Sequence, residues 1–250
     1  MTDSSLTDRG GDQPIAASPT PASWWEDFID IFYAPAQVFA RRAGAGFGIP
    51  MLVVTVLVGL IGIANSGVMQ PVMDAEFTRA TATQMRNNPQ LTSEMMARGR
   101  GLADVIAKYG AFIFVPVGIF LTGLALWLCG KLVDAKEALS AAVMVAAYAF
   151  VPRIVESVLR GVQGLLMDPA TLDGQLRLSL GVGRFLDPDT ASPVLLALLA
   201  RVDVFTIWVT VLLAIGLSVT GRIPRARAAI AAALVWVIGA LPLLLGALRS

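Results

Sequence analysis

The sequence predicts an all-α protein, a polytopic membrane helix bundle of five transmembrane helices preceded by an N-terminal interfacial helix. Hydrophobic residues make up 56% of the 250 residues and charged residues only 15%, whereas a soluble domain is typically about a quarter charged. The mean hydropathy of +0.71 agrees. Long uncharged stretches also recur along the chain, and most are long enough to cross a hydrocarbon core of about 30 Å.

The first residues differ from the rest of the chain. Residues 1–22 are polar, with Gly, Pro, Ser and Thr throughout, and they lack the basic and apolar regions of a signal peptide. We therefore expect a disordered tail that stays in the cytoplasm.

Residues 23–42 predict an amphipathic helix at the membrane–water interface. Ser23 with Glu26 three residues later is a capping-box pattern, so a helix should begin at Trp24. Pro35 should end it and start a second turn. The predicted anchors are the aromatic residues of the apolar side and the two cations that follow: Trp24, Trp25, Phe28, Phe32, Arg41 and Arg42. The alternatives are that the aromatics pack on the protein's own helices or form a partner site.

Residues 43–250 should form the transmembrane domain. Uncharged stretches place four spans, with cores at Ile49–Ser66, Ala111–Gly130, Val204–Gly221 and Ala228–Leu248. A further candidate, Ala138–Pro152, has only fifteen uncharged residues, and by its length alone it could be a buried half-helix.

The positions of the cations favour a crossing at Ala138–Pro152, because Lys and Arg gather in short cytoplasmic loops. If this stretch crosses and the N-terminus is inside, seven cations fall in three short cytoplasmic stretches: Arg41, Arg42, Lys131, Lys136, Arg222, Arg225 and Arg227. The prediction is therefore five spans, with the N-terminus in the cytoplasm and the C-terminus outside. An Arg- and Ala-rich composition favours a bacterial cytoplasmic (inner) membrane.

Two outer loops, residues 67–110 and 162–202, should carry local structure. The first predicts two short helices broken at residues 87–89, with Thr92 or Ser93 capping the second. The second loop has mostly turn chemistry, and Ser192 followed by a proline could start a short helix before the fourth span.

The composition argues against most catalytic chemistry. There is no histidine and a single cysteine, Cys129, which removes histidine-based triads, common zinc sites and a disulfide framework. Nucleophile-elbow, P-loop and dinucleotide motifs are absent as well. A net charge of +1 provides no basic surface for nucleic acid. We therefore expect no enzyme, no cofactor, no metal site and no nucleic-acid partner.

Polar residues at membrane depth are the remaining candidates, because they are costly there: Asn65, Arg153, Glu156 and Asp203. Arg153 and Glu156 are spaced to pair on one helix face, just after a kink expected at Pro152. They could belong to a transport path, but a compensated pair at the outer interface is the favoured interpretation. Asp203 fits a helix N-terminus, and Asn65 fits a hydrogen bond between helices.

Several short motifs together resemble the Yip1 domain family. They are IFYAPAQVF in the aromatic segment, NPQLTSEMMARG before the second span, YAFVPRIVESVL in the third and RVDVFTIWVTVLLAIGLSVT in the fourth. The resemblance extends from about Trp24 to Leu248 and implies a five-span core. Eukaryotic members associate with prenylated Rab GTPases in vesicle traffic. Their Asp-Leu-Tyr-Gly-Pro motif is absent here, where the nearest segment is Phe32-Tyr33-Ala34-Pro35, so the resemblance does not carry Rab binding to this chain.

Two functions remain open. The first is a non-enzymatic, Yip1-like membrane protein that organises a membrane site or recruits an unidentified protein partner. The second is a small transporter or channel, which would have to work through few polar groups. Small residues at four-residue spacing, such as Gly62 and Ser66, indicate packing within the chain or, alternatively, a homo-oligomer. Membrane lipids are partners in every case.

Overall fold

The computed structural model describes residues 23–87, 90 and 92–248, and over these residues the chain is helical, without a strand. The predicted fold class, an all-helical protein with apolar helices, is confirmed. The disordered tail predicted for residues 1–22 lies outside the described residues.

The N-terminal segment forms two short helices, α1 (Asp27–Asp30) and α2 (Pro35–Arg41). The break predicted at Pro35 is confirmed, but the start predicted at Trp24 is wrong. Only half of the capping box forms: the Glu26 carboxylate accepts a hydrogen bond from the Ser23 backbone N–H at 3.1 Å, and a turn occupies the next residues. The helix therefore begins three residues later.

Four helical segments are long and apolar enough to cross a membrane: α3 (Gly48–Asn65), α6 (Ala111–Leu132), the pair α7 (Leu139–Ala149) and α8 (Pro152–Leu166), and the pair α11 (Arg225–Ile238) and α12 (Leu241–Ala247). The predicted fourth span corresponds to α10 (Val204–Thr220), which is apolar but has only 17 residues.

Two of these segments bend at prolines. Pro152 is the first residue of α8, and the bend before it joins α7 and α8 into one apolar segment of 28 residues. Proline lacks the N–H that an uninterrupted helix would use, so the chain turns there. The doubtful stretch Ala138–Pro152 is thus half of a long segment. Pro242 similarly follows a break between α11 and α12 inside the predicted last span.

The two long connections carry the expected local structure. Residues 67–110 contain α4 (Gln70–Asn87) and α5 (Ser93–Tyr109), and Thr92 caps α5 by accepting from the Met95 N–H at 3.3 Å. The second connection holds three 3-10 turns, η1 (Pro169–Thr171), η2 (Gln175–Leu178) and η3 (Val182–Phe185), followed by α9 (Pro193–Leu199). Ser192 caps α9 at the Leu195 N–H, 3.2 Å away.

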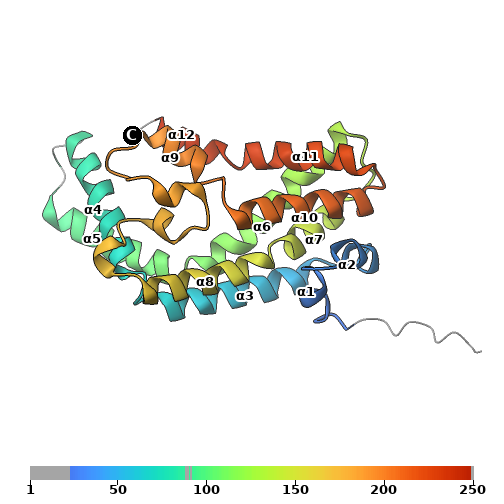
Figure 1. Ribbon diagram of the computed structural model, residues 1–250, viewed down its shortest axis with the longest axis horizontal. Helices are drawn as coiled ribbons and strands as arrows, with labels where there is room; N and C mark the ends of the chain where they lie inside the picture. Colours follow the sequence, from blue (N-terminus) through green and yellow to red (C-terminus); the bar gives the residue numbers. More distant parts are fainter. Residues whose placement is uncertain (1–22, 88–89, 91, 249–250) are drawn as a thin grey trace, which may run out of the picture.

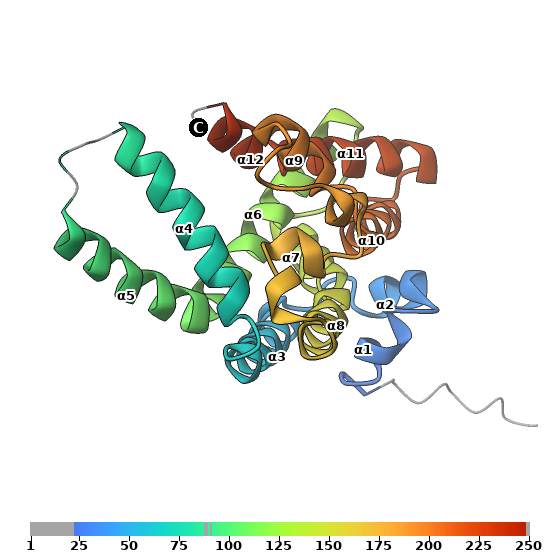
Figure 2. The ribbon, with the colours of Figure 1, turned by 60° about the vertical axis from the view of Figure 1, so that its left-hand side comes forward.

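The bundle has two distinct ends (Figure 1). The helices α1 and α2 lie at one end, here called the N-terminal end, together with the α6–α7 and α10–α11 turns. The helices α4, α5, α9 and α12 lie at the opposite end, called the hairpin end, where the pair α4–α5 projects from the bundle (Figure 2). The seven cations predicted to be cytoplasmic belong to elements of the N-terminal end.

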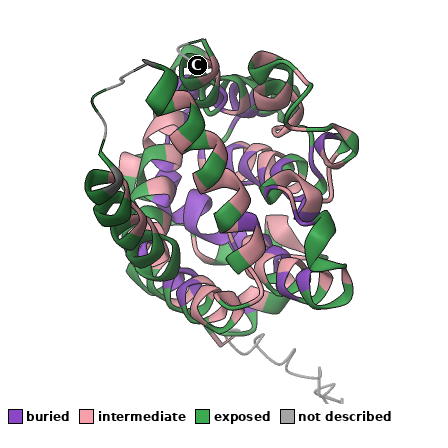
Figure 3. Cartoon of the chain, turned by 90° about the vertical axis from the view of Figure 1, so that its left-hand side faces the viewer, coloured by how far each residue is buried: buried purple, intermediate pink, exposed green. Residues whose placement is uncertain are grey.

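The core is built around α7. Every residue from Ala142 to Ala149 is at most 3% exposed, and α7 packs against α3, α6 and α10. Ile31, Val38 and Phe39 of the N-terminal segment complete this core and are fully buried. The helices around it expose large apolar side chains, whereas α4 and α5 are mostly exposed or half-buried (Figure 3).

The close contact between α6 and α7 predicts that adding a side-chain carbon at the contact destabilises the protein. A Cβ atom on Gly123 would lie 2.6 Å from the Val143 Cα, so backbone would have to move. We expect Gly123→Ala to lower the free energy of unfolding by about 1–3 kcal/mol, the usual cost of overpacking. Gly118→Ala on the same helix is the matched control, since nothing lies within 4 Å of the added carbon. Equal unfolding midpoints of the two variants in detergent would contradict this packing.

Candidate functional site

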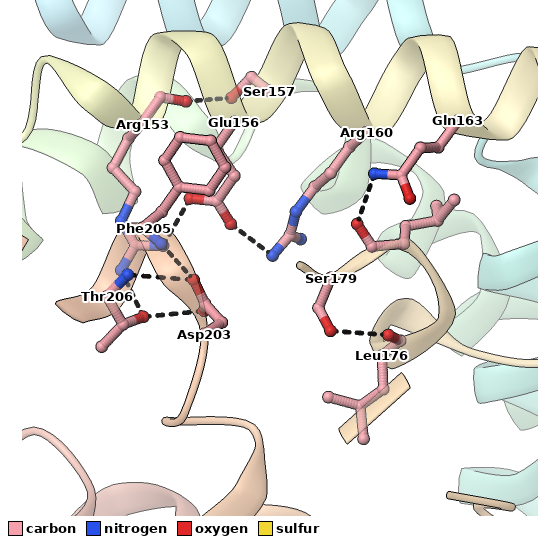
Figure 4. Close-up of polar contacts among 11 residues, drawn as sticks. Arg153, Glu156, Ser157, Arg160, Gln163, Leu176, Ser179, Asp203, Phe205 and Thr206 are labelled. Carbon is pink, nitrogen blue, oxygen red and sulfur yellow. Dashed lines mark hydrogen bonds and ion pairs between the residues drawn. The ribbon is translucent and has the colours of Figure 1, made fainter. Parts of the chain in front are cut away.

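Three of the four polar residues predicted at membrane depth meet between the first turns of α8 and the start of α10 (Figure 4). Arg153 and Glu156 lie on α8, and Asp203 precedes α10. We call these residues, together with Arg160 and Thr206, the α8–α10 polar network.

Glu156 is the centre of the α8–α10 polar network. Its Oε2 pairs with Arg153 Nη1 at 2.5 Å, and its Oε1 pairs with Arg160 Nη2 at 2.7 Å. The expected pair is therefore a three-residue group in which one buried carboxylate bridges two half-buried guanidinium groups. Their i,i+3 and i,i+4 spacing allows this, because such residues share a helix face.

Asp203 organises the α10 side of the network. Its Oδ1 accepts from the backbone N–H groups of Phe205 and Thr206 at 2.7 and 3.0 Å, so it is the helix cap expected from the sequence. Its Oδ2 accepts from the Thr206 hydroxyl at 2.9 Å. Arg153 Nη2 donates to that hydroxyl oxygen at 3.0 Å and thereby links α8 to α10.

Arg201 adds a further half-buried cation beside the network. Its Nη2 donates to the Trp236 carbonyl at 3.2 Å, and its Nε is buried without a hydrogen-bond partner among the described residues. Burial lowers the pKa of this guanidinium, and the charge of Arg153 lowers it further. The network and Arg201 together bring three guanidinium groups against the carboxylates of Glu156 and Asp203, which leaves an excess of positive charge.

Asn65 lies on the other side of α8. Its side-chain N–H donates to the Ser157 carbonyl at 2.9 Å, as expected for a bond between helices. The close approach depends on Gly161, where an added Cβ would overlap the Asn65 amide. Asn65, Ser157 and Arg160 all line a cleft of about 770 Å³ between α8 and the base of the α4–α5 hairpin.

The polar side chains of this region are mainly paired donors and acceptors. Across the described residues, no three Asp, Glu or Cys side chains are placed to hold a metal ion. The polar groups of α8 and α10 mostly satisfy one another. The side-chain groups left without a hydrogen bond here are donors, since the buried Nε atoms of Arg160 and Arg201 have no partner among the described residues.

The structure divides the six predicted interface anchors into three kinds. Phe28 and Phe32 pack inward, with ring centroids 5.6 Å from Tyr148 and 5.2 Å from Trp208. Trp24 and Trp25 remain about half exposed, at 50% and 57%. The cations Arg41 and Arg42 form ion pairs within the segment.

The ion pairs of the N-terminal segment centre on Asp27, which is fully buried. Arg41 Nη2 lies 2.6 Å from Asp27 Oδ1, Arg42 Nε pairs with the other oxygen, and Arg41 also pairs with Asp30. Hydrogen bonds from Tyr33 and Arg41 lower the pKa of Asp30. This arrangement folds α2 back onto α1 and presents the two aromatic rings of Phe28 and Phe32 to the bundle.

Glu137 is a polar residue that the sequence does not single out. It lies in the α6–α7 turn at the N-terminal end, only 5% exposed, and its carboxylate oxygens have no hydrogen-bond partner among the described residues. Burial raises its pKa to about 7, although the charge of Lys131 opposes the shift. Lys131 donates instead to the Glu137 backbone carbonyl at 3.0 Å. A carboxylate in a short polar turn gives no sequence signal of burial.

These features define an all-helical membrane protein whose buried carboxylates, Asp27, Glu137, Glu156 and Asp203, lie around an apolar core. The chain belongs to the Yip1 domain family, because the model of that family matches residues 29–246. No curated protein and no solved structure matches the chain.

Proposed function

We propose that the chain crosses a bacterial cytoplasmic membrane five times and acts without catalysis, organising a membrane site or recruiting a protein partner. The observation that carries the proposal is the closed centre of the bundle. Residues 142–149 of α7, around which the core is built, present only buried Ala, Val and Met side chains and Tyr148. A conduit needs polar groups or space at that level, so this packing favours a scaffold over a transporter.

The arrangement of the two ends supports five crossings with the N-terminus in the cytoplasm. The helices α1 and α2 lie at one end and α12 at the other (Figure 1), as an odd number of crossings requires. The fifth crossing would be α10, whose 17 residues span about 25 Å at 1.5 Å per residue. The helix α10 packs beside α7 and α11, and a small tilt of its longer neighbours accommodates the difference.

The recruiting surface in this proposal is the outer end of α4 in the α4–α5 hairpin. It projects away from the apolar bundle (Figure 2), and Gln84, Met85 and Arg86 near the end of α4 are exposed. A surface that the bundle does not need for its own packing is available to another protein.

Site-specific photo-crosslinking in native membranes tests this proposal. A photoreactive residue at Gln84 should give discrete adducts with another protein, whereas the same residue at Leu52, on the exposed face of α3, should give only lipid adducts. The same adduct pattern at both positions would contradict recruitment by the hairpin. Adducts that contain only a second copy of this chain would indicate a homo-oligomer instead of a separate protein partner.

A further inference from the structure

The cleft beside α8 lies at the level where the apolar helices end. It is bordered by the last turns of α3, the first turns of α4, the last turns of α5, the middle of α8 and η2. Its volume of about 770 Å³ is within the usual range of about 300–1,000 Å³ for small-molecule sites.

The base of α5 continues the lipid-facing side of α6. The helical hydrogen bonds run through Gly110, whose N–H donates to Ile106 at 2.7 Å and whose carbonyl accepts from Phe114 at 2.8 Å. Large apolar side chains are exposed along the two helices in succession: Leu102, Val105, Tyr109, Ile113, Phe114 and Val117. Lipid that covers α6 therefore also reaches the base of α5, next to the cleft.

One part of the cleft is apolar and adaptable. Met69 just before α4, Val72 and Met73 of α4, Ile106 of α5 and Leu178 of η2 line it together, and Val72, Leu178 and Met69 pack in one apolar cluster. Methionine side chains are flexible and polarizable, so such a wall accepts chains of variable shape. This part suits an acyl chain.

The other part of the cleft offers hydrogen-bond donors. Arg160 uses its Nη2 on Glu156, while its Nε is buried and has no hydrogen-bond partner among the described residues. Arg160 itself lines the cleft, so its guanidinium can donate to an acceptor bound there. Lys108 also lines the cleft, and the acidic residue there, Asp104, accepts from Arg100 Nε at 2.9 Å.

We propose that this cleft binds one anionic phospholipid, with the phosphate group on Arg160 and an acyl chain against Met69, Met73 and Ile106. An acidic head group can accept from the guanidinium of Arg160, which lines the cleft, and it offsets the excess positive charge of the neighbouring polar network. Guanidinium groups suit phosphate because their N–H groups form charge-assisted, directional bonds. The inference rests on the membrane location of the chain and not on partner recruitment.

Native mass spectrometry of the delipidated full-length protein tests the proposal. Phosphatidylglycerol should bind with a stoichiometry of one at low concentration, whereas phosphatidylcholine with the same chains should bind much more weakly. Arg160→Gln should weaken phosphatidylglycerol about tenfold or more, because a charge-assisted hydrogen bond is lost. Ile106→Trp should weaken it comparably by filling the apolar part while leaving the ion pairs intact, so a folding defect at Arg160 cannot hide the result.

Lys136→Gln is the matched control, since Lys136 is an exposed cation at the N-terminal end, and it should bind like the unmodified protein. Equal binding of the two lipids, or unchanged affinity in both cleft variants, would overturn the proposal. Displacement of the lipid by millimolar inorganic phosphate would also overturn it, because it would show a site for the anion without the acyl chain.

Discussion

Replacing Glu137 with glutamine is expected to stabilise the protein by about 3 kcal/mol at pH 8, and to change little at pH 4.5. The carboxyl group has a pKa of about 7 in the folded chain against an ordinary value of 4.5. The folded state therefore binds the proton more tightly, and stability falls as the pH rises from about 4.5 to about 7 and is constant above. Glutamine has nearly the shape of the neutral carboxyl group and cannot ionise. It therefore avoids the free energy of ionising a buried carboxyl group, which is about 1.4 kcal/mol per pKa unit.

Unfolding by SDS titration from mixed micelles at several pH values measures this effect. Glu94→Gln is the matched control, because its carboxylate is 75% exposed and pairs with Arg98 on the same helix. A difference between Glu137→Gln and the unmodified protein that does not grow with pH would show that folding does not raise the pKa of the Glu137 carboxyl group. Gly221 offers a second check, since a side-chain carbon there would overlap a Glu137 carboxylate oxygen, so Gly221→Ala should destabilise at every pH.

Glu156→Ala is expected to cost about 3–5 kcal/mol, because it leaves two guanidinium groups without their shared carboxylate. Combining it with Arg153→Met should recover part of the loss, because this removes one of the two uncompensated charges. The other, on Arg160, has a side chain that is 34% exposed and can reach water or a lipid head group on its own. The same unfolding titrations, arranged as a double-mutant cycle, give the coupling energy. Additive losses would contradict a shared ion group.

The helices were predictable because apolar length and proline position determine them locally. Pro35 and Pro152 each begin a helix after a break in the chain, and Thr92 and Ser192 cap the helices that follow them through bonds to nearby N–H groups. The prediction that the helix begins at Trp24 was wrong because the capping pattern at Ser23 formed only in part.

The long-range pairings were not predictable from local patterns. Arg153 and Glu156 were expected to pair because they share a helix face, but the contacts of Arg153 with Thr206 and of Asp27 with Arg41 depend on how helices pack. Glu137 is buried because the α10–α11 turn closes over it, as the contact with Gly221 shows. Spacing within a single helix carries no information about such neighbours.

The alternatives left open for the aromatic segment are partly resolved by the same packing. Phe28 and Phe32 contact the bundle, so an interface role remains a prediction for Trp24 and Trp25, which are exposed. Arg41 and Arg42 have carboxylate partners, which reduces the charge that they can offer to anionic lipid.

The central claim is that the N-terminal and hairpin ends lie on opposite sides of the membrane, with five crossings between them. Single cysteines in a Cys129→Ala background test it through labelling of intact cells with a membrane-impermeant thiol reagent. The exposed positions Gln84 and Thr190 at the hairpin end should react from outside, whereas Lys136 and Ala226 at the N-terminal end should react only after the membrane is opened. Labelling of Ala226 in intact cells would contradict the five-span arrangement.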